Sequence, residues 1–472
     1  MPQNPPTRRL PGATLFFAIL ILWIASIAGS WVWRGVLSWS SGLLYAGYDT
    51  WLIFYVAVMA RRAIAAARAQ RRAPAPATPV TLSVLVAARN EAGALPATLD
   101  AVLPQLQPGD EVLVVDDGSS DGTSALLAEA YGIPAGGSGP CAASFTRRGL
   151  RVLRKPNSGK ADSLNQALRV ARGSVVVTLD ADTVLESGAL AALRAAFGGD
   201  PSLAAVCGIL RPNCGPGLVA RGFQWFQRFE YLRAFLSRAA WMRADALLLV
   251  SGAFAGYRRE VLEQLRGFDA TSLVEDYELM HRLHRYAGDH GLTWRVRVVA
   301  DAIADTHAPG TLAGFLRQRR RWFAGFLQTQ YRNRDMTGNP RYGRVGRFML
   351  PLKLVDTLQP VYGITAFALL VSFLVRGSPV LRPVLILILT KVIIDLCYQL
   401  WALRLYQRWL GRPVPAGLWP MAALAALIEP FSFQLMRHTG ALLGWFAILT
   451  RRMDWAPQRP ASSGVGRTAA GA

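Results

Sequence analysis

Long apolar runs at both ends of the chain flank a middle part of short β-branched runs and polar clusters. The long runs share a length close to that of a helix that crosses a bilayer, and they cover residues 14–32, 42–60, 358–375 and 380–403. A cleaved signal peptide is the alternative for the first run, but that run is too long for the usual leader. A last run, 418–449, is interrupted by Glu429 and Arg437 and predicts two short crossings or one re-entrant or interfacial element. The pattern predicts a multi-pass membrane protein.

Arginines beside the apolar runs predict their orientation. Arg8 and Arg9 precede the first run, and Arg34 alone lies between the first and second runs. A larger basic group follows the second run: Arg61, Arg62, Arg68, Arg71 and Arg72. The positive-inside rule then places both ends of this hairpin in the cytoplasm. We therefore expect a protein of the inner membrane whose middle part is cytoplasmic.

The middle part alternates between strand-like and helix-like patterns. Strand-like runs at 80–88, 112–115, 150–153 and 175–179 are separated by segments with helical periodicity. This alternation predicts a parallel sheet with right-handed crossovers. Several runs end in polar clusters, and open sheets of this type bind ligands at the carboxyl ends of their strands. Farther along, 250–257 is interpreted as a glycine-rich turn.

Composition decides between two readings of the charge. Lys+Arg 52 against Asp+Glu 30 gives a net charge of +22, which suits nucleic acid or a membrane surface. The mean hydropathy of +0.24 and the 52% hydrophobic content favour the membrane and disfavour a nucleic-acid partner. The four cysteines follow no metal-ligand spacing and predict free thiols in a reducing compartment.

Two carboxylates end the most apolar of the strand-like runs. Asp180 and Asp182 follow 175–179 directly. Residues i and i+2 of a strand share a face, so both carboxylates can converge on one hard cation that bridges to a substrate phosphate. For an isolated D-x-D pattern, a solvated pair at a strand end is the alternative. The surrounding clusters favour the cation site.

Polar residues of other kinds end the neighbouring runs. Asp116 and Asp117 can accept hydrogen bonds from uracil or ribose, although an Asx-type turn is the alternative. Lys160 follows a glycine at a helix start, a position suited to a diphosphate, and a surface lysine is the alternative. No P-loop or dinucleotide fingerprint stands at a strand–helix junction, so those folds are disfavoured.

Two later clusters complete the candidate chemistry. Glu275 and Asp276 begin a predicted helix, where a helix cap is the alternative to a general base that accepts a proton from a hydroxyl. Gln318, Arg321 and Trp322 lie on an amphipathic segment that starts near residue 311. A cationic helix on the membrane surface explains its arginines, whereas an indole beside an active site stacks well on a sugar face.

Together and in this order, these clusters resemble the membrane-embedded, inverting glycosyltransferases of family two, such as cellulose, chitin, hyaluronan and poly-N-acetylglucosamine synthases. The resemblance covers roughly residues 80–322 and the flanking helices. It rests on Asn90-Glu91, Asp116-Asp117-Gly118-Ser119, Gly159-Lys160, Asp180-Ala181-Asp182, Glu275-Asp276 and Gln318-x-x-Arg321-Trp322. One position departs from the family: Arg89 stands where an aromatic residue is usual, and its guanidinium plane can stack instead.

The resemblance implies a fold and a division of the chain. The fold is α/β of the GT-A type, with a Rossmann-like, mixed and mostly parallel sheet, in a cytoplasmic domain inserted between transmembrane helices. The implied parts are a transmembrane hairpin with a basic end (1–72), a GT-A domain (80–310), amphipathic interface helices (311–347), transmembrane or interfacial helices (348–455) and a disordered tail (456–472).

The resemblance also implies a role for each cluster. Asp276, with Glu275, is the implied catalytic base, and Asp180 and Asp182 are the implied ligands of Mg²⁺ or Mn²⁺. The residues implied to contact UDP are Asn90, Glu91, Asp116, Asp117, Lys160, Gln318 and Arg321. Those implied to contact the acceptor are Trp322, Ser251 and Gly252.

Three functions remain open at this point. The first is a processive inverting polymerase that uses UDP-N-acetylglucosamine or UDP-glucose and extrudes its polysaccharide through the membrane, with an accessory export subunit as a further partner. The second is an enzyme that adds one sugar to a membrane lipid, as ceramide and diacylglycerol glucosyltransferases do. The third is an inactive membrane scaffold or nucleotide sensor, against which the intact carboxylates argue.

Overall fold

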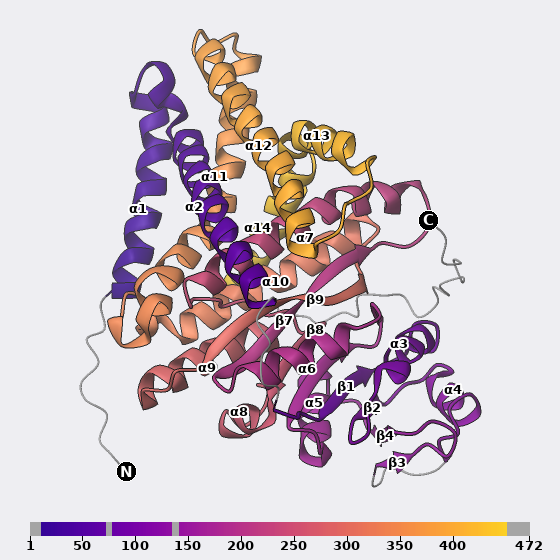
Figure 1. Ribbon diagram of the computed structural model, residues 1–472. Helices are drawn as coiled ribbons and strands as arrows, with labels where there is room; N and C mark the ends of the chain where they lie inside the picture. Colours follow the sequence, from indigo (N-terminus) through magenta and orange to yellow (C-terminus); the bar gives the residue numbers. More distant parts are fainter. Residues whose placement is uncertain (1–10, 72–77, 135–140, 451–472) are drawn as a thin grey trace.

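A computed structural model describes residues 11–71, 78–134 and 141–450 of the chain. It combines a sheet domain with a group of long helices that rise from one side of that domain (Figure 1). The predicted tail 456–472 lies outside the described residues, as do Arg8, Arg9 and Arg72, on which part of the predicted orientation rests.

A mixed sheet of nine strands forms the centre of the domain, in the order β3-β4-β2-β1-β5-β8-β7-β9-β6. The strands are β1 (Leu82–Ala88), β2 (Glu111–Asp117), β3 (Ala142–Ala143), β4 (Leu150–Lys155), β5 (Val175–Asp180), β6 (Thr183–Leu185), β7 (Leu203–Asn213), β8 (Phe254–Arg258) and β9 (Arg295–His307). The first four predicted strands are confirmed as β1, β2, β4 and β5, which pair in parallel. Their carboxyl ends therefore lie along one edge.

Alternating residues of β1 face two different helical layers. The helices of the domain are α3 (Leu95–Val102), α4 (Thr123–Glu129), α5 (Lys160–Val170), α6 (Ala189–Gly199), α7 (Leu218–Arg243), α8 (Arg259–Gln264), α9 (Glu275–His290) and α10 (Leu312–Arg332). Val84 and Val86 belong to a core cluster with α3 and α6, whereas Leu85 belongs to another cluster with α5. Because helices cover both faces, a continuous apolar run is needed in these strands.

The interpretation of residues 250–257 as a turn is wrong in its second half. Phe254–Arg258 is strand β8, which lies antiparallel between β5 and β7 in the middle of the sheet. A side chain at Gly256 would meet Val206 at 2.9 Å and Phe197 at 3.0 Å, so the strand carries glycine where a neighbour approaches closely. Gly256, one of the glycines that suggested a turn, is therefore explained by close packing inside the sheet.

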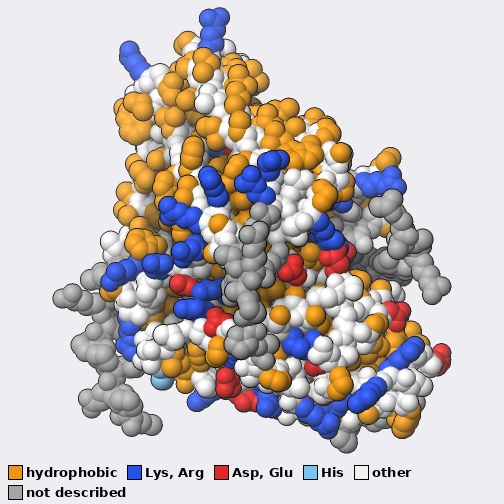
Figure 2. Space-filling view, viewed as in Figure 1, with side chains coloured by type: hydrophobic (Ala, Val, Ile, Leu, Met, Phe, Trp, Pro, Cys, Tyr) orange, Lys and Arg blue, Asp and Glu red, His pale blue; other side chains and the backbone are white. Residues whose placement is uncertain are grey.

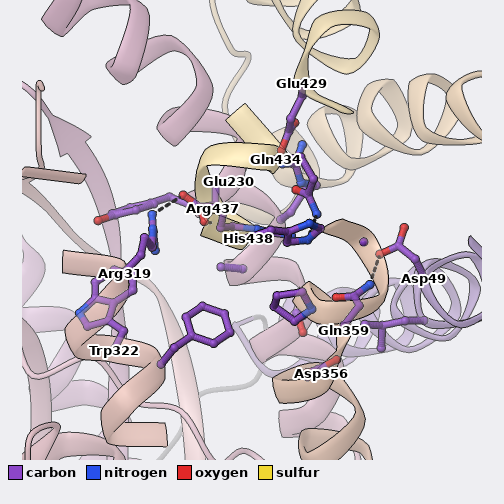
Figure 3. Close-up of a pocket in the computed structure, with 18 of the residues that line it drawn as sticks. Asp49, Glu230, Arg319, Trp322, Asp356, Gln359, Glu429, Gln434, Arg437 and His438 are labelled. Carbon is purple, nitrogen blue, oxygen red and sulfur yellow. Dashed lines mark hydrogen bonds and ion pairs between the residues drawn. The ribbon is translucent and has the colours of Figure 1, made fainter. Parts of the chain in front are cut away.

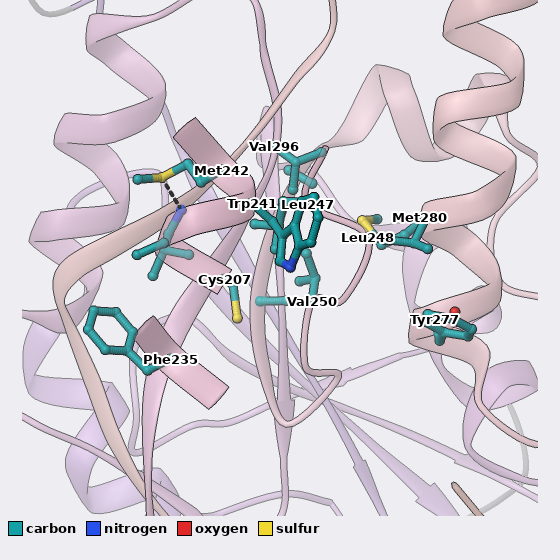
Figure 4. Close-up of a cluster of buried hydrophobic side chains, with 14 of the residues drawn as sticks. Cys207, Phe235, Trp241, Met242, Leu247, Leu248, Val250, Tyr277, Met280 and Val296 are labelled. Atoms are coloured by element: carbon teal, nitrogen blue, oxygen red, sulfur yellow. Dashed lines mark hydrogen bonds between the residues drawn. The ribbon is translucent and has the colours of Figure 1, made fainter. Parts of the chain in front are cut away.

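Helix α7 joins the sheet domain to the long helices through one core. Three side chains of α7, those of Phe235, Trp241 and Met242, lie in one buried cluster. The same cluster includes Val56 of the long helix α2 (Ser40–Arg71) and Leu403 of the long helix α12 (Leu381–Leu410). Figure 4 shows Trp241 and Phe235 among side chains of the sheet and of α9. Since this core is continuous, the carboxyl edge of the sheet is held in a fixed position relative to the long helices.

Within the described ranges, six helices make up the apolar part: α1 (Pro11–Val32), α2 (Ser40–Arg71), α11 (Leu350–Val375), α12 (Leu381–Leu410), α13 (Leu418–Ile428) and α14 (Phe433–Leu449). Three segments of the described residues are long and apolar enough to cross a membrane: Gly35–Ala67, Val345–Val375 and Leu381–Leu410. Leu418–Phe431 and Phe433–Leu449 qualify together, with a bend of 48° at their break, while the described apolar stretch of α1, Phe17–Val32, is shorter. Hydrophobic side chains cover these helices, and basic ones gather where the helices meet the domain (Figure 2).

Candidate active site

One cavity of about 640 Å³ opens at the carboxyl edge of the sheet and extends between the long helices. The residues implied to act as base, metal ligands and acceptor contacts all line it, together with three of those implied to contact UDP: Asp276, Glu275, Asp180, Asp182, Trp322, Ser251, Gly252, Lys160, Gln318 and Arg321. These residues come from segments up to 162 positions apart in the sequence, between Lys160 and Trp322. The fold therefore brings them to a single place.

Lys160 is the first residue of α5 and connects two of the carboxylates. Its Nζ lies 2.6 Å from Oδ1 of Asp180 and 3.2 Å from Oε1 of Glu275. Burial opposes its positive charge, but Asp180 and Glu275 together raise the pKa of Lys160 above its ordinary value. The lysine is therefore a fixed cation at the end of β5.

Asp276 is held by backbone groups in place of a cation. The N–H of Gly252 donates to its Oδ2 and the N–H of Tyr277 to its Oδ1, both at 2.7 Å. Burial, followed by the charge of Glu275, raises the pKa of Asp276. The pKa of Glu275 moves the other way, because Lys160 and Arg321 outweigh the effect of its burial. Asp276 thus has the character of a proton acceptor.

Gly252 allows the close approach of Asp276. A Cβ at this position would lie 3.3 Å from both Cβ and Oδ2 of Asp276, tighter than most real contacts. Its backbone N–H could not then reach the carboxylate at the same distance. The glycine-rich segment before β8 accordingly shapes the site, whether or not it touches an acceptor.

Asp180 and Asp182 fit a divalent cation that completes its shell with other groups. Both line the cavity, and the side chain of Asp180 is 34% exposed at the end of β5. Within the described part of the chain, no group of three or more His, Cys, Asp or Glu side chains could hold a metal ion. Two carboxylates leave ligand positions for water and for phosphate oxygens, which is how Mg²⁺ is usually bound in sites that handle phosphates.

Four of the seven residues implied to contact UDP lie at the ends of neighbouring strands and are not part of this lining: Asn90, Glu91, Asp116 and Asp117. Asp117 accepts from the N–H groups of Ser158 at 2.8 Å and Gly159 at 2.9 Å, and it pairs with Lys155. It therefore fixes the loop that leads to Lys160. Gly159 has a φ of +95°, a conformation that suits glycine at this turn.

Asn90, Glu91 and Asp116 stabilise the adjoining turn at the ends of β1 and β2. The side chain of Asn90 accepts from the N–H of Ser120 at 2.7 Å, and Asn90 itself has a φ of +58°. Asp116 accepts from the N–H of Ser119 at 3.0 Å, and the N–H of Glu91 donates to Thr123 at 3.0 Å. The N–H of Ser119 lies three residues after Asp116, one more than in an Asx turn, and the hydroxyl of Ser124 also donates to Asp116, so its carboxylate has local partners.

Helix α10 carries Gln318, Arg321 and Trp322 along the cavity. The side chain of Thr311 accepts from the N–H of Gly314 and caps the helix, which agrees with the predicted start near residue 311. Arg321 lies close enough to Glu275 to lower the pKa of that carboxyl. One side of this helix thus faces the carboxylates.

The cavity continues into the apolar part, where ionic side chains line it. Figure 3 shows Asp49, Gln359, Gln434 and His438 around this section. The carboxylates here lie against cations: Glu429 with Arg233, Asp356 with Lys353 at 2.7 Å, and both Asp49 and Asp395 with Lys391. Charged residues inside an apolar run are costly in lipid, and this signal, which marks Asp395 and Glu429 in the sequence, could also have found Asp49 and Lys391.

Comparison with known proteins gives two family matches. The family described as "Glycosyl transferase family 2" matches residues 83–266, and "Glycosyl transferase family group 2" matches residues 175–448, more than half of the chain.

Several curated relatives are poly-beta-1,6-N-acetyl-D-glucosamine synthases. One from Staphylococcus epidermidis is 26% identical over 301 residues, which cover 64% of this chain and 66% of the relative. One from Staphylococcus aureus (strain MSSA476) is 28% identical over 246 residues, which cover 52% and 54%. The matches therefore span less than two thirds of these relatives. A solved mannosyltransferase from Pyrobaculum calidifontis, in complex with GDP-Man and Mn²⁺, covers 81% of this chain and 99% of its own, with 23% identity and a TM-score of 0.49.

Proposed function

Because the chain belongs to the family 2 group of glycosyl transferases, we propose that it builds a β-linked polysaccharide from a UDP-sugar. The single observation that carries the proposal is the continuity of the cavity, which runs from Asp180 and Asp276 to Asp395 and His438 between the long helices. The names of the curated relatives make UDP-N-acetylglucosamine the first donor to test and UDP-glucose the second.

The chemistry is a single displacement. The acceptor hydroxyl gives its proton to Asp276 while its oxygen forms a bond to the anomeric carbon of the donor. The bond between that carbon and the diphosphate oxygen breaks, and UDP leaves with the electron pair. Attack from the side opposite the diphosphate converts an α-linked donor into a β-linkage. The raised pKa of Asp276 supports this role, because a stronger base takes up the proton more readily.

Positive groups next to Asp276 would stabilise the leaving diphosphate. Lys160 and Arg321 bring positive charge to the cavity. Asp180 and Asp182 would hold Mg²⁺ or Mn²⁺, which supplies neutralisation of the diphosphate charge when bound. Gln318 would accept a hydrogen bond from a hydroxyl group of the donor, since its Oε1 is buried and has no partner within the described residues.

The donor and acceptor would occupy different ends of the cleft. Asn90, Glu91, Asp116 and Asp117 would border the nucleoside, partly through the turns that they hold. On the acceptor side, Trp322 would stack on the terminal sugar, with Ser251 and Gly252 at its edge.

The membrane section of the cavity favours a polysaccharide over a lipid acceptor. Its lining includes charged and amide side chains such as Asp49, Gln359, Lys391 and Gln434. Such groups hydrogen-bond well to sugar hydroxyls, whereas they are costly beside an acyl chain. The product would leave through this section from a cytoplasmic active site across the inner membrane. An accessory export subunit would then act on the far side.

Incubation of membranes with radiolabelled UDP-N-acetylglucosamine or UDP-glucose in parallel tests the proposal. We expect labelled product too large to enter a high-percentage gel from one of the two donors, and none from membranes that carry the Asp276→Asn variant. Label found only in an organic-soluble, mono-glycosylated lipid would refute polymer synthesis.

A further inference from the structure

Arg319 is a buried cation that the proposed chemistry does not use. It lies between Gln318 and Arg321 on α10 and is only 3% exposed. Its guanidinium carbon is 4.3 Å from the centre of the Trp322 ring and 4.6 Å from that of Phe315. The guanidinium therefore lies over the indole that lines the cavity, in a cation–π arrangement.

Glu230 of α7 fixes the position of this guanidinium. Its Oε2 lies 2.6 Å from Nη2 of Arg319, and its Oε1 lies 3.8 Å from Nη1 of Arg437 in α14. Figure 3 shows Glu230 next to Arg319, with Trp322 below them. A buried arginine needs such a partner, because a lone charge is costly away from water. The direction of the guanidinium is thus set from outside α10.

Helix α14 closes the remaining side of Arg319. A Cβ at Gly440 would lie 2.5 Å from Cβ of Arg319, and one at Gly444 would lie 2.6 Å from the carbonyl oxygen of Arg320. These glycines are four residues apart, so they form a smooth strip on which α10 rests. The backbone of α10 next to Trp322 has no room to shift toward α14.

We propose that Glu230 and Arg319 are positioning residues that hold the indole of Trp322 as a rigid platform for the acceptor sugar. This inference rests on the proposed function. One face of the indole is covered by the guanidinium, and the ring contributes to the cavity wall that also contains Asp276. A platform of fixed tilt keeps the terminal hydroxyl of the acceptor directed at Asp276 during each transfer.

A second explanation is that the pair only ties α7 to α10. In that case its loss would lower stability, or lower all kinetic constants together, with no preference for the acceptor. The two explanations therefore differ in the KM values for acceptor and donor.

The test uses the full chain purified in lipid nanodiscs, with UDP-N-acetylglucosamine as donor and short β-1,6-linked N-acetylglucosamine oligomers as acceptor. The variants are Arg319→Lys, which keeps the charge but loses the planar stack, and Glu230→Gln, which keeps a hydrogen-bond acceptor. Arg317→Gln, an exposed position of the same helix, is the matched control. Two independent variants guard against failure of either one to fold.

We expect both variants to raise the acceptor KM about tenfold and to leave the donor KM within about twofold. The control should match the wild type. In a Trp322→Phe background, Arg319→Lys should add less to the acceptor KM than it does alone, because its effect passes through the indole. Equal changes in both KM values, or full additivity with Trp322→Phe, would overturn the inference. A wild-type protein that makes no polymer would refute the proposed function itself, which is a separate result.

Discussion

Carboxylates occur in two parts of the same cavity, and their surroundings differ. Between the long helices, Asp49, Asp395 and Glu429 each lie in an ion pair with a lysine or arginine. At the carboxyl edge of the sheet, Asp180 and Glu275 share Lys160, but Asp276 accepts only backbone N–H groups and makes no ion pair with any described residue.

This difference in ion pairing bears on the role of each carboxylate. Buried negative charge is costly, so a carboxylate that keeps no cation of its own must gain something else from its position. At the sheet edge, a bound acceptor can deliver a proton to Asp276. Between the long helices no such delivery is expected, and the charges are neutralised by the protein itself. In the proposed mechanism, the carboxylate that lacks a cation is the one that takes up the proton.

Asp276→Asn should have the largest effect on turnover. The amide keeps the size of the side chain but cannot accept the proton, so kcat should fall by about 10²–10⁴-fold while UDP still binds. Turnover is measured as UDP release, and UDP binding by calorimetry. Normal turnover in this variant would remove Asp276 from the mechanism.

Removal of divalent cations should affect the sheet edge and leave the ion pairs between the long helices unchanged. Chelation should lower turnover by about 10²-fold or more, because the diphosphate charge is no longer neutralised at Asp180 and Asp182. Thermal stability should stay nearly constant, since the ion pairs between the long helices are made by protein side chains. Readdition of Mg²⁺ or Mn²⁺ restores activity if this account holds, and full activity in the chelator contradicts it.

Lys391→Met should affect stability more than any change at the sheet edge. It leaves Asp49 and Asp395 without their cation, which should cost about 3–5 kcal/mol of folding free energy. The measurement is the denaturant or thermal midpoint in detergent micelles. Arg404→Met, at an exposed position of the same helix α12, is the control and should change stability by less than about 0.5 kcal/mol. Equal effects of the two variants would show that the pairing is unimportant.

Glu275→Gln should give the smallest effect, a shift in pH dependence. Asp276 must be deprotonated to act, so kcat/KM falls as the pH drops through its pKa. Glu275 raises that pKa by charge repulsion. Its removal should therefore move the acidic limb to lower pH, by about one unit. The exposed Glu260→Gln is the control, and a limb that moves upward or stays in place would contradict the assignment.

The sequence was informative where apolar runs end in polar clusters. β1, β2, β4 and β5, with the carboxylates that follow them, could be predicted because a strand buried on both faces carries a continuous apolar run. β8 could not, since its glycine, Gly256, reflects the close approach of Phe197 and Val206. That Asp180 and Asp276 line one cavity was implied only by the resemblance, because no local pattern encodes proximity across 96 positions.

In the part of the cavity between the long helices, the sequence predicts charged residues but not their partners. Asp395 and Glu429 could be identified as costly in lipid, yet their partners could not, since Lys391 and Arg233 lie on helices whose rotation is set by packing. Likewise, the predicted apolar run begins only at residue 358, but its helix, α11, already begins at Leu350 and continues through Pro360. The pairing of Glu230 with Arg319 could not be predicted from the sequence, because only the fold brings α7 beside α10.

One cavity is proposed to serve both sugar transfer and passage of the product, and this is the central point to test. Sealed inverted vesicles that contain the protein test it most directly, with labelled UDP-N-acetylglucosamine outside and a polymer-degrading glycosidase added after synthesis. We predict long labelled polymer that the glycosidase cannot reach until detergent opens the vesicles. Polymer that is digested completely in sealed vesicles, or label confined to a mono-glycosylated lipid, would contradict the claim.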